Sequence, residues 1–298
     1  MLLLTGATGL IGGALLPRLL AEGHTVRCLV RDPRRLGPQR VRVQIALGDL
    51  ADPPSFRNAM RGVDTVVHLA SSTRDQPHGS IEELNGIASW RMVDAARRAG
   101  AERFIFLSVL GASTHHRARL FRAKALAEQA VGEADLHTTV LAASFAYAPQ
   151  DRWSELLGRL SLLPAVPLPG GGHAELQPIW ADDVAACVAA CLRAPAAGPH
   201  TRLELAGPQT RTVAEVARLL LRALDRPRPL LSIPTPLVSR GLRMVQRMGG
   251  DSLLPTWDEA ELTEVSMTTP RGSADAERLG VAPKEMAAVL GVERHPGC

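Results

Sequence analysis

The sequence predicts an α/β protein with a doubly wound parallel sheet, because strand and helix patterns alternate through the first half of the chain. Short apolar runs such as residues 65–69 contain β-branched side chains and suit strands that are buried on both faces. The stretches between them, such as residues 10–21, carry apolar residues at helical spacing. Strands separated by helices indicate parallel βαβ units.

The expected elements of the first half follow one another closely. Gly23 and Gly100 come directly after two of the helices, where glycine favours helix termination. The expected strands are residues 1–4, 25–30, 42–47, 65–69, 103–107 and 138–141, and the expected helices are residues 10–21, 82–99 and 117–131.

The pattern changes after residue 149. Residues 162–172 are rich in proline and glycine and are expected to form a loop. Thr212, with Glu215 three residues later, has the capping-box pattern that begins a helix. The other expected elements are a helix over 181–192, a strand over 202–205, a proline-punctuated segment over 227–236 and helical chain such as 237–248. We predict a sheet domain over residues 1–150 and a smaller, discontinuous lobe over 151–298, with residues 177–206 returning to the sheet.

Composition limits the classes of function. The chain has 298 residues, 46% of them hydrophobic, and a net charge of +4. The basic residues are scattered, and no block of about five or six like charges suggests a nucleic-acid or membrane tail. No apolar run reaches the roughly 18 residues of a membrane span, and no secretory leader is recognisable. We expect a soluble, cytoplasmic protein with no nucleic-acid partner.

The cysteines, Cys28, Cys187, Cys191 and Cys298, form no C-x-x-C pair and lack zinc-ligand spacing. Cys187 and Cys191 share one face of a predicted helix, so a metal pair is one interpretation. Small buried thiols in a reducing compartment are the alternative that we expect. No metal site is predicted.

A glycine-rich turn follows the first strand, with Gly6, Gly9 and Gly12 spaced GxxGxxG. The first glycine permits the tight turn, the second admits a pyrophosphate close to the backbone, and the third lets helix and strand pack closely. Phosphates then lie at the helix N-terminus, where free N–H groups favour anions. We expect Thr8, Leu10 and Ile11 to adjoin the same dinucleotide. A purely structural turn is the alternative.

Five segments in this order and spacing resemble the short-chain dehydrogenase/reductase superfamily: TGATGLIG, LVRDP, GDL, VVHLAS and FIFLSVLGA. The chain is similar to the atypical branch that includes NmrA-like proteins and the NADPH-binding accessory subunit of mitochondrial complex I. The resemblance continues through residues 177–185 and 205–208 and fades beyond about residue 226. It implies a Rossmann fold that binds NAD(P). It also implies that Asp49 and Leu50 line the adenine, and that Leu69, Ala70 and Ser71 run beside the adenosine ribose and pyrophosphate.

The residues after the second strand predict a preference for NADP(H) over NAD(H). Arg31 follows Val30, and Arg34 and Arg35 lie close by. An arginine at this place suits the 2′-phosphate of NADP, because a guanidinium pairs well with phosphate. Asp32 competes with this interpretation, but we expect it to shape the turn before a proline. A solvated basic loop is the alternative.

The superfamily's chemistry uses a Tyr-x-x-x-Lys pair and a serine. Ser108, at the end of a strand, and Lys124, on the next helix, match the serine and the lysine. Lysine occurs only twice in the chain, which makes Lys124 notable, although a surface lysine is the alternative. Asn85 resembles a family position that supports the site; a buried structural hydrogen bond is the alternative.

The tyrosine of that pair is missing, because Leu120 stands four residues before Lys124. The chain's one tyrosine, Tyr147, is followed four residues later by Asp151. Candidate proton donors are Tyr147, His115 and His116, each of which also has a structural or solvent-exposed interpretation.

Two functions follow. The first is an NADP(H)-dependent oxidoreductase with an unusual proton donor, acting on a quinone or another small carbonyl compound. The alternative is a non-catalytic NADP(H)-binding protein, either a redox sensor or an assembly or structural partner of a larger complex. The sequence identifies neither a substrate nor a protein partner.

Overall fold

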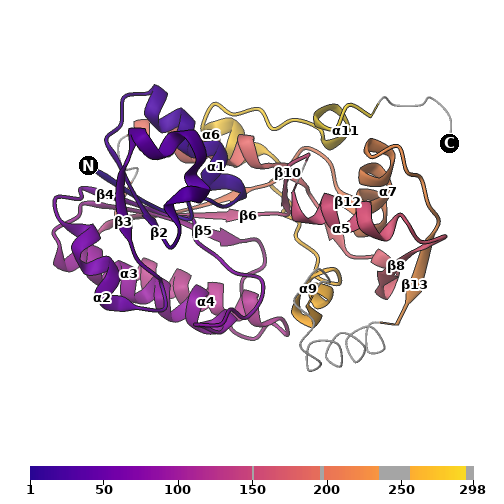
Figure 1. Ribbon diagram of the computed structural model, residues 1–298, viewed down its shortest axis with the longest axis horizontal. Helices are drawn as coiled ribbons and strands as arrows, with labels where there is room; N and C mark the ends of the chain where they lie inside the picture. Colours follow the sequence, from indigo (N-terminus) through magenta and orange to yellow (C-terminus); the bar gives the residue numbers. More distant parts are fainter. Residues whose placement is uncertain (150, 195–197, 235–255, 293–298) are drawn as a thin grey trace.

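The computed structural model describes residues 1–149, 151–194, 198–234 and 256–292, and its centre is a seven-stranded parallel sheet (Figure 1). The strand order is β11-β6-β5-β4-β1-β2-β3, which confirms the predicted doubly wound Rossmann fold. The strands are β1 Leu2–Thr5, β2 Val26–Val30, β3 Gln44–Leu47, β4 Thr65–His68, β5 Arg103–Val109, β6 His137–Ala143 and β11 His200–Leu205.

Helices cover both faces of the sheet (Figure 1). Helices α1 (Leu10–Ala21) and α6 (Ala181–Arg193) lie on one face and bury side chains such as Leu15 and Val188 against it. Helices α2 (Pro53–Arg57), α3 (Ala88–Arg98) and α4 (Arg119–Gly132) lie on the other face. The central strands β1, β4 and β5 are therefore covered on both sides, which explains why they are almost continuously apolar, whereas the edge strands β3 and β11 are largely exposed or half-buried.

The connection between β4 and α3 differs from the expected single helix over 82–99. A π-helical turn, η3 (Glu83–Ile87), precedes α3. At this turn the Asn85 side chain donates from Nδ2 to the carbonyl oxygen of Ile81 at 2.8 Å. This bond satisfies a backbone acceptor at the start of the π-helical turn. A single π-helical turn is a local distortion of a helix, and the spacing of apolar residues does not reveal it.

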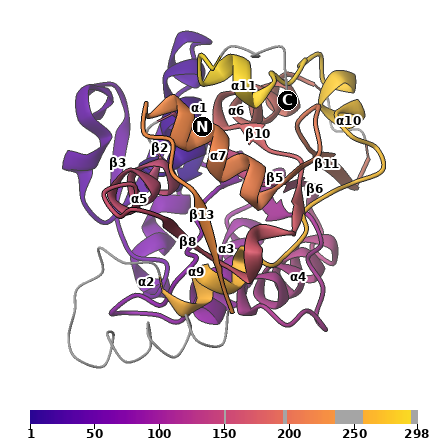
Figure 2. The ribbon, with the colours of Figure 1, turned by 90° about the vertical axis from the view of Figure 1, so that its right-hand side faces the viewer.

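The elements beyond the sheet gather at the end of the molecule that faces the viewer in Figure 2. They surround a second hydrophobic cluster. Leu157, Leu168, Val216 and Leu220 are among its buried members. The elements that supply it are α5 (Arg152–Leu160), β8 (Val166–Pro169), β9 (Glu175–Leu176), α7 (Val213–Ala223) and α11 (Met286–Val289). Thr212 and Glu215 form the predicted capping box at the start of α7.

The expected loop over 162–172 is wrong in part, because it contains strand β8. This strand pairs in parallel with β13 (Leu230–Ile233), which lies inside the proline-punctuated segment. A two-stranded ribbon tolerates Pro167 and Pro169, because each strand has a free edge that needs no N–H donor. The proline content therefore hid the strand.

Cys28, Cys187 and Cys191 are free, buried thiols, as expected. The expected helix over 237–248, along with Cys298, lies outside the described residues. Within the described ranges, every helix is too short or too polar to cross a lipid bilayer.

Candidate dinucleotide-binding and active site

The parallel sheet brings the sequence-predicted residues to one edge. Gly6 follows β1, Arg31 follows β2, Leu69 to Ser71 follow β4, and Ser108 lies near the end of β5. All these strands run in the same direction, and β1 lies between β2 and β4 where the strand order reverses. Ligands of doubly wound sheets bind outside the carboxyl ends of the strands at such a switch point.

The glycine turn has no space for side chains at two of its positions. Gly6 has φ +73°, and a Cβ there would lie 2.7 Å from the backbone nitrogen of Ala70. A Cβ at Gly12 would lie 2.1 Å from the Gly6 carbonyl oxygen. Gly9 and Leu10 are exposed, α1 has no side-chain cap, and its first turn contains no acidic residue. The open helix N-terminus fits the pyrophosphate of a dinucleotide.

Residues 69–72, here called the strap, lie directly against this turn. Leu69 is buried, and the backbone N–H of Ala70 donates to Thr5 Oγ1 at 3.3 Å. The Ser71 hydroxyl donates to Asn85 Oδ1 at 2.7 Å. Asn85 is thus a buried residue that binds the strap.

The end of β2 presents exposed arginines. Arg31, Arg34 and Arg35 are exposed, and their guanidinium groups form no hydrogen bond or ion pair within the described residues. The Asp32 carboxylate accepts from the Arg34 backbone N–H at 2.9 Å and caps a 3-10 helix over Pro33–Arg42. Asp32 therefore shapes the turn, as expected.

The residues after β3 are also turn-forming. The Asp49 carboxylate accepts from the Ala51 backbone N–H at 3.0 Å, and its carbonyl accepts from the Ser55 hydroxyl at the same distance. Leu50 is half-buried and packs on the hydrophobic cluster beneath α3. Both residues lie beside the β2 end because β3 pairs with β2.

Lys124 is buried rather than a surface lysine. Its side chain on α4 is 1% exposed, donates from Nζ to the Leu107 carbonyl oxygen at 2.8 Å, and lies 4.7 Å from the centre of the Phe106 ring. Burial lowers the pKa of Lys124 to about 7. Ser108, on the same strand as Leu107, is 2% exposed, and its hydroxyl has no hydrogen-bond partner among the described residues.

Leu120, at the place of the family tyrosine, is buried. It is buried in a cluster with Ile81, Phe121 and Val265. Among the described residues, helix α9 (Trp257–Leu262) lines a narrow crevice beside Leu120 that is too small for a water molecule. The crevice is lined by Thr73, Ile81, Ala118, Arg119, Leu120, Asp258, Glu261 and Leu262.

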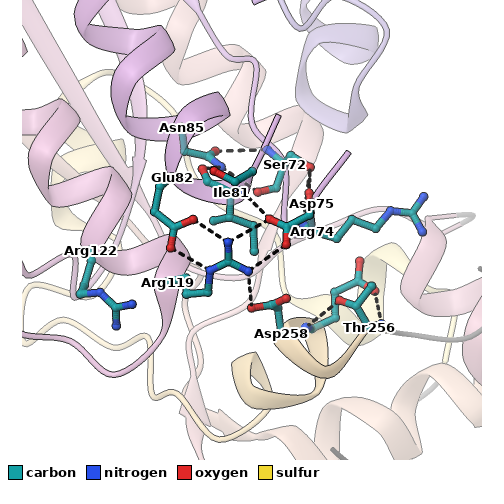
Figure 3. A network of polar contacts seen from close by, with 12 residues as sticks. Ser72, Arg74, Asp75, Ile81, Glu82, Asn85, Arg119, Arg122, Thr256 and Asp258 are labelled. Atoms are coloured by element: carbon teal, nitrogen blue, oxygen red, sulfur yellow. Dashed lines mark hydrogen bonds and ion pairs between the residues drawn. The ribbon is translucent and has the colours of Figure 1, made fainter. Parts of the chain in front are cut away.

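Arg119 ties this closed region together through three carboxylates (Figure 3). It forms paired hydrogen bonds with Glu82, at 2.7 and 2.6 Å, and with Asp75, both at 3.0 Å. A third contact, at 3.5 Å, joins it to Asp258 on α9. Hydrogen bonding to Arg119 lowers the pKa of Glu82 to about 2, whereas burial raises the pKa of Asp258 to about 6.

The three candidate proton donors occupy different environments. Tyr147, on β7 (Ala146–Tyr147), is fully buried, burial raises its pKa, and its hydroxyl has no partner within the described ranges. His116 stacks on Phe121 at 4.5 Å, and burial lowers its pKa. His115 is exposed.

The sequence analysis did not predict the network of Arg119 with its three carboxylates. The one indication of it in the sequence is that an arginine directly precedes Leu120.

One family model matches about two thirds of the chain. The model described as NAD(P)H-binding matches residues 6–195, from the glycine turn to the end of α6. The chain belongs to the NAD(P)H-binding family. The family model thus includes Gly6, Arg31, the strap, Ser108 and Lys124 within its matched range.

Curated relatives of this NAD(P)H-binding protein agree with the resemblance to atypical short-chain dehydrogenases. The Arabidopsis thaliana mitochondrial NADH dehydrogenase [ubiquinone] 1 alpha subcomplex subunit 9 is 29% identical over 78% of this chain and 60% of its own length. The photosystem II assembly factor Ycf39 of Cyanophora paradoxa is 31% identical over 47% of this chain and 43% of its own. A ceramide reductase of Caulobacter vibrioides is 30% identical over 65% and 62%, respectively. The chain therefore spans 60% or less of the first two relatives.

Solved structures share the fold of this NAD(P)H-binding family member. A nucleoside-diphosphate-sugar epimerase of Staphylococcus aureus has a TM-score of 0.77 at 18% identity, covering 98% of this chain and 99% of its own. A Thermus thermophilus UDP-glucose 4-epimerase, solved with NAD, has a TM-score of 0.64 at 18% identity, covering 88% and 97%. At these identities the likeness establishes the Rossmann architecture.

Proposed function

We propose that the chain binds NADP(H), in preference to NAD(H), across the glycine turn and the strap. The observation that supports this preference is the set of exposed, unpaired guanidinium groups after β2, of which Arg31 is nearest the strand. Asp32, the residue that competes for the ribose, is engaged with the Arg34 backbone. Arg35 would add a second charge toward a 2′-phosphate.

Gly6, Gly9 and Gly12 would hold the pyrophosphate, with Thr8, Leu10 and Ile11 around it. Asp49 and Leu50 would lie at the adenine, and Leu69, Ala70 and Ser71 along the ribose and pyrophosphate. The unpartnered Ser108 hydroxyl and the Lys124 ammonium would lie toward the nicotinamide end, where the buried hydroxyl needs a partner that the described protein does not supply.

A titration tests the cofactor proposal. Binding of NADPH and NADH to the purified protein is followed by fluorescence, for the wild type, for Arg31→Ala and for Arg40→Ala. Arg40 is an exposed arginine at the other end of the same 3-10 helix, so it is a matched control. We expect Arg31→Ala to weaken NADPH binding about tenfold, since a charge-assisted hydrogen bond contributes about 1.5–3 kcal/mol, and to leave NADH binding unchanged. Equal affinity of the wild type for the two cofactors would refute the preference.

For the reaction, we propose that the chain acts as a non-catalytic NADP(H)-binding protein, as a redox sensor or as an assembly or structural partner. The buried Leu120 carries this proposal, because an apolar side chain packed in a hydrophobic cluster stands where the superfamily places its proton donor, and leucine has no proton to donate. The names of the Arabidopsis subunit and of the Cyanophora assembly factor favour the same role.

The second candidate is an NADP(H)-dependent oxidoreductase on a quinone or small carbonyl compound. The buried Ser108 and Lys124 favour it, since a binding protein alone needs neither, and a ceramide reductase is among the relatives. Stopped-flow oxidation of bound NADPH against a panel of quinones and aldehydes separates the two. Acceleration by any acceptor would refute the non-catalytic proposal, and Tyr147→Phe, His115→Ala and His116→Ala would then identify the donor.

A further inference from the structure

A buried histidine on β4 connects the glycine turn to the helical layer beneath the strap. His68 is fully buried, with Nδ1 at 2.7 Å from Thr5 Oγ1 and Nε2 at 3.1 Å from Ser89 Oγ. Thr5 directly precedes Gly6, and Ser89 lies on α3. The imidazole also stacks on Phe106, with ring centres 5.8 Å apart. Both ring nitrogens are therefore occupied by protein groups.

The direction of each hydrogen bond in this network follows from the proton count. The Ser89 hydroxyl donates its proton to the Asn85 carbonyl oxygen at 2.7 Å. Its oxygen must then accept from Nε2 of His68, because a hydroxyl carries one proton. In a neutral imidazole Nδ1 is unprotonated, so it accepts from the Thr5 hydroxyl, whose oxygen accepts in turn from the Ala70 N–H.

The environment of the imidazole favours its neutral form. Complete burial, together with the nearby Lys124 ammonium, lowers the pKa of His68 to about 3. Both groups contact the Phe106 ring. A single tautomer, protonated on Nε2, therefore satisfies every polar atom of the chain of bonds.

Both ends of the chain of bonds act on the strap. Its first donor is the N–H of Ala70, within the strap itself. Its last acceptor is the backbone carbonyl oxygen of Asn85. The side chain of the same residue accepts from the Ser71 hydroxyl and the Ser72 N–H and donates to the Ser72 carbonyl at 2.8 Å. The chain of bonds therefore binds the start of the strap directly and holds the backbone of the residue whose side chain binds its end.

We infer that His68, protonated on Nε2, is a positioning residue that sets the distance between the strap and the glycine turn across which the dinucleotide lies. This inference rests on the proposed cofactor site. His68 itself is buried beneath that site and acts through Thr5 and Asn85. Substitution of His68 would let the strap move relative to Gly6. The backbones of Gly6 and Ala70 lie so close that a Cβ on Gly6 would not fit between them.

The tautomer is measured first, in the wild-type protein. Nitrogen-15 chemical shifts of the imidazole rings are recorded from pH 5 to 8, and His68 is assigned among the nine histidines by the signal that is missing in His68→Phe or, if that variant does not fold, in His68→Gln. We expect the pattern of an Nε2-protonated ring that does not titrate. An Nδ1-protonated or titrating ring would overturn the inference.

Cofactor affinity is measured next. Gln can place an amide N–H near the position of Nε2, but its carbonyl oxygen cannot then occupy the position of Nδ1 beside Thr5. Ser89→Ala breaks the other end of the chain of bonds. We expect each variant to weaken NADPH binding by about tenfold, as the loss of one or two buried hydrogen bonds implies. Val66→Ala, on the same strand and equally buried, is the control: it should lower the melting temperature and leave the dissociation constant within twofold of wild type.

The outcomes separate this inference from the proposed function. A wild-type protein that binds neither NADPH nor NADH would refute both. A wild type that binds, with His68→Gln and Ser89→Ala binding equally well, would refute the positioning role alone. If the affinity for NADPH fell in proportion to the melting temperature in all three variants, including Val66→Ala, the effect of His68 would be one of general stability. That result would also overturn the inference.

Discussion

The Asp258 carboxylate lies 3.5 Å from the Arg119 guanidinium, so a helix from the end of the chain is joined to the residue beside Leu120. Arg119 also binds Asp75 and Glu82, which flank the η3 turn and the strap. Three segments distant in sequence therefore meet at the place where the superfamily keeps its tyrosine. In this chain the same place holds the ion pairs of Arg119 and the hydrophobic cluster around Leu120.

Leu120→Tyr recreates the Tyr-x-x-x-Lys spacing with Lys124. We expect the variant to give no NADPH oxidation with the acceptor panel. We also expect it to destabilise the fold by about 1–3 kcal/mol, because the narrow crevice beside Leu120 has no space for a tyrosine ring. Chemical denaturation measures the loss. A stable variant that turns over NADPH would show that only the missing hydroxyl separates this chain from a reductase.

Asp258→Asn tests the electrostatics of the closed crevice. Burial raises the pKa of Asp258 from 3.8 to about 6, so the folded state holds its proton more tightly than the unfolded state. The stability of the wild type should therefore fall as pH rises between 4 and 6, whereas asparagine does not titrate. We expect the melting temperature of the variant, relative to wild type, to be higher at pH 7.5 than at pH 4.5. A constant difference would contradict the raised pKa.

Lys124→Met removes a buried ammonium while keeping a similar length. Burial lowers the pKa of Lys124 from 10.5 to about 7, so the unfolded state binds this proton more tightly between those values. Wild-type stability should rise with pH through this range, and the methionine variant should lack that rise. Melting temperatures at pH 7 and 9 measure it, with Lys284→Met as the control for the chain's other lysine.

Gly6→Ala and Gly13→Ala form a matched pair in the same turn and helix. Alanine at position 6 requires a positive φ and places Cβ against the strap, whereas Cβ at position 13 meets nothing within 4 Å. We expect Gly6→Ala to lose NADPH binding and at least about 1–3 kcal/mol of stability. Gly13→Ala should gain about 0.5–1 kcal/mol, since alanine favours helix, and bind normally. Equal behaviour of the two would refute the tight turn.

The Rossmann half was readable from the sequence because its signals are local. Helix α1 has the expected bounds, and the bounds of most of the sheet strands differ by only a few residues. Strand β8 escaped because Pro167 and Pro169 are typical of loops, and only its pairing with distant β13 makes it a strand. Local periodicity contains no information about that pairing.

The site was readable to a smaller extent. The glycine turn, Asp32 and Asn85 carried signals within a few residues, whereas the closure over Leu120 depends on Leu262 and Val265, more than a hundred positions away. His68 was visible as a histidine inside an apolar run, but its partners Thr5 and Ser89 come from β1 and α3. Three-dimensional pairing of isolated polar residues cannot be inferred from spacing.

Strand β11 has a consequence for synthesis of the chain. Among the described strands it pairs with β6 alone, yet about sixty residues separate the two. At roughly 5–20 residues per second, the ribosome leaves the edge of β6 unpaired for several seconds after that strand emerges. An open apolar edge is a template for pairing with other chains, so nascent chains are most prone to misassociate during this interval. We therefore expect misassociation of nascent chains to fall once β11 has emerged and paired with β6.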